Sequence, residues 1–273
     1  MIHSITLPGG ARVHSEVEGE GEPVVFLHAD FVDSRMWDGV RTELAPRFQV
    51  VVYDKMGFGR SEAAQGPQCR RHELSEVLDN LSLGPVHLVG CSNGGLQALD
   101  FTLEHPERVR SLTLVNASPS GWEPQGEPPA QVLAMIAAFQ RGDTAAASEL
   151  QLQLWFDGPV RSASALSPVL KDQRKLASVM NRIAVERGTF FVADANPENP
   201  LSPPAAGRLG EVAVPTLVID GKGDWSENRR ASRFLADGIT GARLVEVEGA
   251  HVPPMEDPEG FAALWENFVS AFA

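Results

Sequence analysis

Four short stretches of the chain are continuously hydrophobic and rich in β-branched residues: VVFLH, VVVYD, VHLVG and TLVID. A strand with one face in water alternates apolar and polar residues, so these stretches are typical of strands that are covered on both faces. Parallel sheets flanked by helices bury their strands in this way. The pattern therefore predicts a central, mostly parallel sheet between two layers of helices.

The order of strand and helix patterns predicts how the sheet is connected. Strands are expected at Arg12–Val17, Val24–His28, Phe48–Asp54, Val86–Gly90, Val109–Ala117, Thr216–Asp220 and Ala242–Glu248. Helical periodicity lies between them at Met36–Leu44, Arg71–Leu81, Gly94–Glu104, Glu227–Leu235 and Pro258–Phe272. The first strand pattern alternates, which predicts an edge strand. Alternation of strand and helix predicts a doubly wound α/β fold.

One long segment interrupts this alternation. Residues 122–204 lack a strand pattern and lie between two proline-rich joints, EPQGEPP and NPENPLSPP. Helical patterns occur there at Ala130–Gln140, Thr144–Phe156 and Ser167–Glu186. We expect residues 122–204 to form a helical cap (lid), and residues 1–121 and 205–273 to form the sheet core.

Composition limits the partners of the protein. The 273 residues include 36 acidic and 23 basic side chains, and the net charge of -13 opposes binding to nucleic acid or to an anionic membrane. No stretch approaches the roughly 20 apolar residues of a membrane helix, and the N-terminus lacks a signal-peptide pattern. Two cysteines, Cys69 and Cys91, provide neither a disulfide framework nor a CxxC metal clamp. We expect a soluble cytoplasmic protein without nucleic-acid or membrane partners, and a homodimer is compatible with the sequence.

The sequence Gly90-Cys91-Ser92-Asn93-Gly94 follows an expected strand and precedes an expected helix. In that context GxSxG indicates a nucleophile elbow, a sharp turn that holds the serine hydroxyl above the edge of the sheet. The two glycines leave room for the backbone to fold tightly, and the helix directs its positive N-terminal dipole toward developing negative charge. We therefore predict that Ser92 is a nucleophile.

A serine nucleophile requires a base within hydrogen-bond reach and a carboxylate that orients the base. Among the seven histidines, His251 lies in a loop between the last strand and the C-terminal helix, from which it can reach the edge of the sheet. Asp224 lies in a turn after the strand Thr216–Asp220, whereas the rival acid Asp220 ends the strand itself. The expected catalytic residues, in chain order, are Ser92, Asp224 and His251.

This order resembles that of the α/β-hydrolase fold superfamily, and in particular its serine esterases and enol-lactonases. Further similar motifs cover nearly the whole chain: DKMGFGRS, LEHPERV, VPTLVIDGKGD and GAHVPPMEDPEGF. The resemblance implies a Ser-His-Asp triad, no cofactor, no metal, and a cap at the position of the helical insertion. It also implies an oxyanion hole formed by the backbone N–H groups of Asp30 and Asn93.

Asp30 places a carboxylate where a negative charge is least expected. At about 4 Å from an oxyanion, a carboxylate costs roughly 1 to 4 kcal/mol, which is comparable to the roughly 3 to 4 kcal/mol that one oxyanion-hole donor supplies. We therefore expect the Asp30 side chain to point away from the oxyanion, to bind a polar group of the substrate, or to be protonated.

The expected function is hydrolysis of carboxylic esters of small organic molecules through an acyl-enzyme on Ser92. The same residues leave open a lactonase of the enol-lactone type, a carbon–carbon bond hydrolase and, outside enzymes, a ligand receptor built on the same fold. The expected partner is a small-molecule ester or lactone substrate. Candidates for its pocket are Phe31, Trp122, Trp155, Trp225 and Val252.

Overall fold

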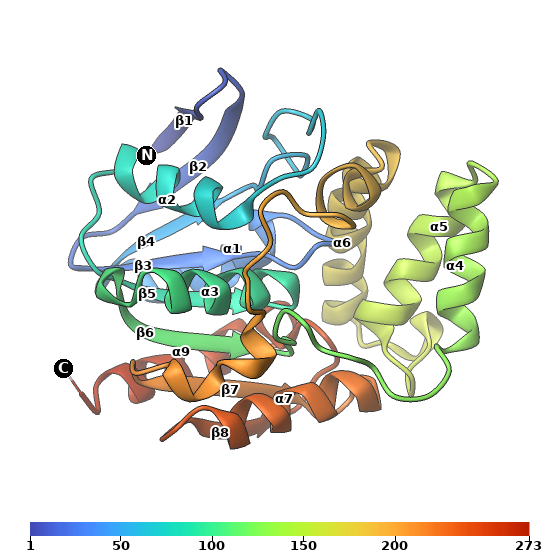
Figure 1. The fold of residues 1–273 in the computed structure, drawn as a ribbon. Coiled ribbons are helices and arrows are strands. Elements are labelled where there is room, and N and C mark those ends of the chain that lie inside the picture. The colour runs from blue at the N-terminus through green and yellow to red at the C-terminus, as the bar shows by residue number, and fades with distance from the viewer. Residues whose placement is uncertain (273) are drawn as a thin grey trace.

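The computed structural model describes residues 1–272 and shows one sheet of eight strands in the order β1-β2-β4-β3-β5-β6-β7-β8 (Figure 1). Neighbouring strands from β4 to β8 pair in parallel, while β2 pairs antiparallel with both β1 and β4. The strands are β1 (Ile2–Thr6), β2 (Arg12–Glu18), β3 (Glu22–Leu27), β4 (Phe48–Tyr53), β5 (Val86–Cys91), β6 (Val109–Val115), β7 (Thr216–Gly221) and β8 (Arg243–Val247).

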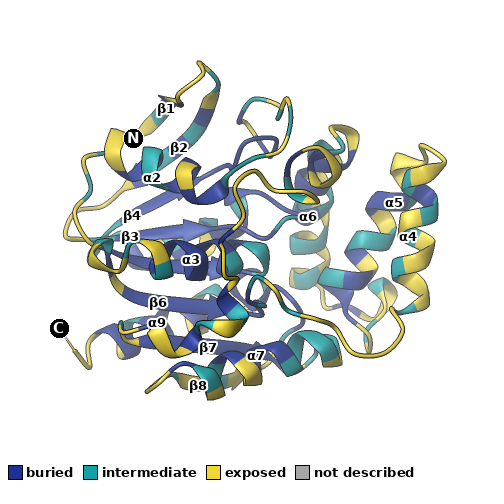
Figure 2. Cartoon of the chain, viewed as in Figure 1, coloured by how far each residue is buried: buried dark blue, intermediate teal, exposed yellow. Residues whose placement is uncertain are grey.

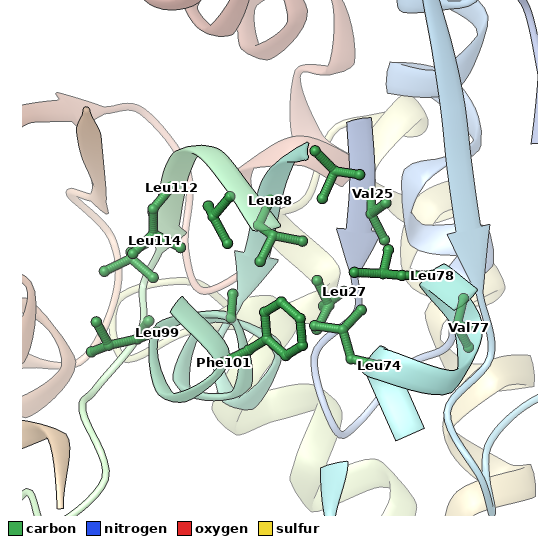
Figure 3. Packing of buried hydrophobic residues seen from close by; sticks show 14 of the residues in the cluster. Val25, Leu27, Leu74, Val77, Leu78, Leu88, Leu99, Phe101, Leu112 and Leu114 are labelled. Carbon is green, nitrogen blue, oxygen red and sulfur yellow. The ribbon is translucent and has the colours of Figure 1, made fainter. Parts of the chain in front are cut away.

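Helices cover both faces of the sheet, so that successive residues of a central strand contribute to two different cores (Figure 1). Val25 and Leu27 of β3 pack toward α2 and α3, as Figure 3 shows, whereas Val24 and Phe26 belong to the core on the opposite face. The first face is covered by α2 (Arg70–Asn80), α3 (Asn93–Glu104) and α7 (Ser226–Gly238), and the second by α1 (Asp38–Leu44), α8 (Pro253–Glu256) and α9 (Pro258–Val269).

The doubly wound, mostly parallel sheet that the apolar runs predict is confirmed. The predicted edge position of the Arg12 strand is wrong, because β1 pairs with it on the outside. Strand β1 has the sequence IHSIT, in which only Ile5 is buried. One buried side chain in five gives no periodic signal, so β1 could not be recognised.

The insertion contains three main helices, α4 (Ala130–Gln140), α5 (Thr144–Gln151) and α6 (Pro168–Glu186), which stand at one end of the sheet (Figure 1). Two π-helical turns, Leu152–Asp157 and Phe190–Asp194, follow α5 and α6. The central strands β5, β6 and β7 are almost wholly buried, whereas much of the surface of α4 is exposed (Figure 2). The 3-10 turns of the chain are Ser34–Trp37, Pro106–Arg108, Ala163–Ala165, Ala205–Gly207 and Leu209–Glu211.

The chain leaves the sheet for the insertion and returns from it at one place. The Ser120 hydroxyl accepts a hydrogen bond from the Ala205 N–H at 2.9 Å, and the Ser120 carbonyl accepts one from the Ala206 N–H at 3.0 Å. Within residues 1–272, no helix combines the length and the apolar character that crossing a bilayer requires.

Candidate active site

Ser92 occupies a strained turn between β5 and α3. Its φ of 56° and ψ of -125° are unusual for a residue with a side chain, and such strain is concentrated at functional sites. The flanking glycines are required by close backbone approach, because a Cβ atom on Gly90 would lie 2.3 Å from the Gly94 carbonyl oxygen, and one on Gly94 would lie 2.4 Å from the Leu27 carbonyl oxygen. The turn therefore has the geometry that the GxSxG motif predicts for a nucleophile elbow.

Asp224 and His251 form a buried hydrogen-bonded pair at the same edge of the sheet. His251 Nδ1 lies 2.7 Å from Asp224 Oδ2. A carboxylate can only accept, so Nδ1 carries the proton and Nε2 keeps a lone pair, the tautomer that a general base requires. The Cys91 thiol, directly before Ser92, lies 3.5 Å from the His251 carbonyl oxygen, which brings the histidine loop to the elbow.

The rival acid, Asp220, has a different partner. It lies on β7 and binds Arg229 Nε at 3.0 Å. The structure thus brings Asp224, and not Asp220, to His251.

Two asparagines hold the acid and the base in place. The Asn116 amide donates to the carbonyls of Ala250 and His251 at 2.9 and 3.0 Å, and accepts from the Gly221 N–H at 2.8 Å. Asn228 Nδ2 lies 3.0 and 3.1 Å from the two oxygens of Asp224. Asn116 therefore joins the histidine loop to the end of β7, and Asn228 fixes the plane of the acid.

The Asp30 carboxylate points to two side-chain donors. One oxygen accepts from the Lys55 ammonium, and the other accepts from the amide of Asn93. Burial by itself raises the pKa of Asp30, but the Lys55 charge and these hydrogen bonds outweigh it and hold the pKa below its ordinary value. These contacts argue against the protonated arrangement that the sequence left open, because the Asp30 carboxylate is bound to Lys55 and Asn93 of the protein itself.

His28 supports the loop that carries Asp30. Its Nε2 accepts the backbone N–H of Lys55 at 3.1 Å, and its Nδ1 lies 2.8 Å from the Ala29 carbonyl oxygen. Burial and the nearby Lys55 charge lower the pKa of His28 to about 3, so this histidine is neutral. Its role is to connect two loops rather than to transfer protons.

The five predicted pocket residues occupy three kinds of place. The rings of Phe31 and Trp155 lie 6.4 and 5.0 Å from the His251 ring, between centroids. Val252 is fully buried in the core, and the Trp225 indole donates to the Leu154 carbonyl at 2.8 Å, which ties the acid loop to the insertion. Trp122 packs against Phe234 at a tilted angle, with the Arg230 guanidinium carbon 4.0 Å from the centre of its ring, on the surface of α7. Phe31 and Trp155 remain the best-placed candidates for substrate contact.

Sequence reasoning missed Lys55, Asn116 and Asn228. Lys55 and Asn116 come one or two residues after the buried strands β4 and β6. The carboxyl ends of parallel strands meet at one edge of a sheet, where ligands bind, so this position was a usable signal. Asn228 lies in the first turn of α7, and nothing in its surrounding sequence distinguishes it.

The fold and this geometry define a hydrolase with an elbow serine. The family model of the alpha/beta hydrolase fold matches residues 22–258, and the chain belongs to that family. The family membership that the sequence motifs indicated is confirmed, and the chain is a hydrolase.

Similar proteins act on different bonds. A protein of Azorhizobium caulinodans, provisionally named a carbamate hydrolase, is 29% identical over 95% of this chain and 96% of its own. The 2-hydroxy-6-oxononadienedioate/2-hydroxy-6-oxononatrienedioate hydrolase of Escherichia coli K12 is 27% identical over 95% of this chain and 91% of its own.

Two solved structures have a similar fold. Est816, described as an N-acyl homoserine lactone degrading enzyme, is 27% identical with a TM-score of 0.80 and covers 97% of this chain and 100% of its own. The enol-lactonase of Burkholderia xenovorans LB400 is 24% identical with a TM-score of 0.78 and covers 98% of this chain and 100% of its own.

Proposed function

We propose that this chain hydrolyses carboxylic esters of small organic molecules through an acyl-enzyme on Ser92. The observation that carries the proposal is the Asp224–His251 pair, 2.7 Å between Oδ2 and Nδ1, beside a serine at φ 56° on the elbow. This combination supplies a nucleophile, a base with a free Nε2, and an acid that fixes the tautomer of the base.

We assign each step of the reaction to one of these residues. Ser92 Oγ attacks the ester carbonyl while His251 Nε2 takes the hydroxyl proton, and the backbone N–H groups of Asn93 and Asp30 donate to the oxyanion. When the tetrahedral intermediate collapses, the C–O bond breaks and His251 returns the proton to the departing alcohol. Water then repeats the attack on the acyl-enzyme, with His251 again as base, and releases the acid.

A cavity beside the site supports a small substrate. The space at Asp30 beneath the insertion measures only about 10 Å³, room for no more than a water molecule, and is lined by Phe139, Val185, Phe190 and Phe191, with Gln151. A larger cavity, of about 320 Å³, begins at Asn93. Its lining is mostly apolar, with Leu96 and Leu201, and also includes the polar Gln97 and Asp100. Small-molecule pockets usually measure about 300 to 1,000 Å³. We assign the cavity at Asn93 to the substrate.

Lactones and carbon–carbon bonds are the alternatives that the relatives favour, through the lactone-degrading Est816 and the oxononadienedioate hydrolase. Lactone hydrolysis uses the same acyl-enzyme chemistry, because a lactone is a cyclic ester. Since the matches named above are enzymes, they do not favour the ligand receptor.

A labelling and turnover experiment tests the proposal. We expect a fluorophosphonate probe to label Ser92, and p-nitrophenyl esters from acetate to octanoate to be turned over with a preference for short chains. Ser92→Ala should abolish labelling and lower kcat at least about a thousandfold, whereas the exposed control Ser4→Ala should change neither. Lactones and a ring-cleavage dienedioate are measured beside the esters. Faster turnover of either would replace the ester proposal, and undiminished activity of Ser92→Ala would contradict the triad.

A further inference from the structure

We propose that Lys55 is a positioning residue of the oxyanion hole: its ammonium compensates the Asp30 carboxylate and holds it against the Asn93 side chain. The two residues whose backbone N–H groups would bind the oxyanion are thereby joined through their side chains. This inference rests on the proposed function, because it concerns the oxyanion of the ester reaction.

The contacts form a clamp across three adjacent strands. Lys55 follows β4, Asp30 follows β3 and Asn93 follows β5, and these strands lie side by side in the order β4-β3-β5. Lys55 Nζ and Asn93 Nδ2 donate to different oxygens of the same carboxylate. The Asp30 carboxylate therefore fixes the distance between the backbone N–H groups of Asp30 and Asn93. Lys55, which follows β4, in turn holds this carboxylate.

The clamp is secluded from water. The Lys55 side chain is 0% exposed and that of Asp30 is 13% exposed. Lys55 Nζ also lies 5.0 Å from the centre of the Phe58 ring, which screens it further. A buried ion has a high desolvation cost, and removing one partner of a buried pair leaves the other uncompensated. Without Lys55, the Asp30 charge would act directly on the oxyanion.

The neighbouring charges are engaged elsewhere. Arg70 of α2 binds Glu73 and Asp194, and Asp54 accepts from Arg60 and from the Ser34 N–H. His28 is neutral, because its pKa is lowered to about 3 by burial and by Lys55. Among the described residues 1–272, Lys55 is the one cation whose nitrogen lies within 4.0 Å of the Asp30 carboxylate.

A purely structural ion pair and an oxyanion clamp differ in their effect on pH dependence. In Lys55→Met, burial without a counter-charge raises the pKa of Asp30, so that this group ionises as the pH rises. The negative charge of an ionised Asp30 then repels the oxyanion. Since the oxyanion exists in the transition state and not in the bound ester, the repulsion lowers kcat. The clamp therefore predicts a loss of kcat that grows with pH, while a packing defect reduces kcat equally at every pH.

The experiment measures kcat and KM for p-nitrophenyl acetate from about pH 6 to about pH 9. For Lys55→Met, we expect the ratio of its kcat to the wild-type kcat to fall by about tenfold to a hundredfold across this range, with KM within about threefold. The double variant Asp30→Asn/Lys55→Met carries no buried charge at the clamp and should show a flat, largely restored ratio. The exposed lysine variant Lys175→Met, which also loses an ion pair, should match wild type.

The outcomes separate this inference from the proposed function. If Ser92 of the wild type is not labelled by a fluorophosphonate, both fail. If Ser92 is labelled but the Lys55→Met ratio is constant with pH, or the double variant is no faster than Lys55→Met at high pH, the clamp alone is refuted. Circular dichroism and thermal unfolding confirm the fold of each variant, and Lys55→Gln replaces Lys55→Met if the latter does not fold.

Discussion

Asn228 contacts both members of the Asp224–His251 pair. Its amide nitrogen lies 3.0 and 3.1 Å from the Asp224 oxygens and 3.2 Å from His251 Nδ1. Because Nδ1 donates its own proton to Asp224, the amide donates to the carboxylate. Hydrogen bonds to a charged acceptor are about twice as strong as neutral ones, and residues that orient a catalytic group influence it at a distance.

We predict that Asn228→Ala lowers kcat about tenfold, equivalent to about 1.4 kcal/mol, and leaves KM within about twofold. Asn228→Asp should lower kcat further, since a second carboxylate beside Asp224 repels it and disturbs the imidazole. Steady-state kinetics with p-nitrophenyl butyrate measure both effects. The control is Asn80→Ala, which removes an exposed asparagine from α2. The backbone N–H of Trp225 also donates to Asp224, at 2.7 Å. If kcat of Asn228→Ala equals that of wild type, this one hydrogen bond is sufficient to orient the Asp224 carboxylate.

At the scale of residues, the sequence could predict those side chains whose role is marked by the residues next to them in the chain. Ser92 has glycines on both sides, and His251 and Asp224 each follow a recognisable strand. Lys55 and Asn228 depend instead on which loop lies opposite them. That arrangement is set by the order β4-β3-β5 and by the path of α7, neither of which appears in local sequence.

At the scale of elements, the prediction was accurate where periodicity was strong. Helix α4 has the predicted bounds, and the seven strands that were predicted, β2 to β8, begin and end within two residues of their predicted limits. The predicted helix Thr144–Phe156 instead ends at Gln151 and continues as a π-helical turn. The Trp225 indole donates a hydrogen bond to the Leu154 carbonyl and so connects this π-helical turn to the loop of Asp224. Such a tertiary contact is not encoded in the local sequence pattern.

Helix α3 is attached to both ends of the insertion through Asp100. This carboxylate accepts from the Ser120 hydroxyl at 2.7 Å, and the same hydroxyl accepts from the Ala205 N–H. Burial raises the pKa of Asp100 to about 6, against the lowering effects of the Ser120 hydrogen bond and the Arg71 charge. In the unfolded chain this pKa is about 3.9, so the folded state binds more protons between about pH 4 and pH 6.

The raised pKa of Asp100 makes the unfolding free energy of wild type depend on pH. As the pH rises through about 4 to 6, wild type loses stability because a buried carboxyl must ionise. We predict that Asp100→Asn, which keeps an acceptor for Ser120, removes this loss, so that its unfolding free energy relative to wild type rises by about 1 to 3 kcal/mol from pH 4 to pH 7. Urea unfolding at both pH values measures it. The exposed control Asp172→Asn should show no such trend, and a constant difference for Asp100→Asn would mean that Asp100 titrates normally.

At the scale of the whole molecule, the net charge of -13 repels anionic substrates over a distance set by ionic strength. We predict that kcat/KM for an ester with a distal carboxylate rises about two- to tenfold between low and high salt, while that for a neutral ester of the same size stays constant. Stopped-flow or steady-state assays in sodium chloride measure the ratio. The opposite trend, with the anionic ester favoured at low salt, would indicate a cationic subsite and would favour a dienedioate-type substrate.

The two ends of the insertion meet at one place beside the sheet. Ser120 and Ala205 are hydrogen-bonded neighbours, although the sequence between them is long. The strands that flank this junction, β6 and β7, pair directly with each other, so the sheet is continuous without the insertion. The pairing of β6 with β7 therefore sets the register at this place without any contribution from residues 122–204. Ser92, Asp224 and His251 all lie outside this segment, so the groups that the proposed reaction uses belong to the sheet core.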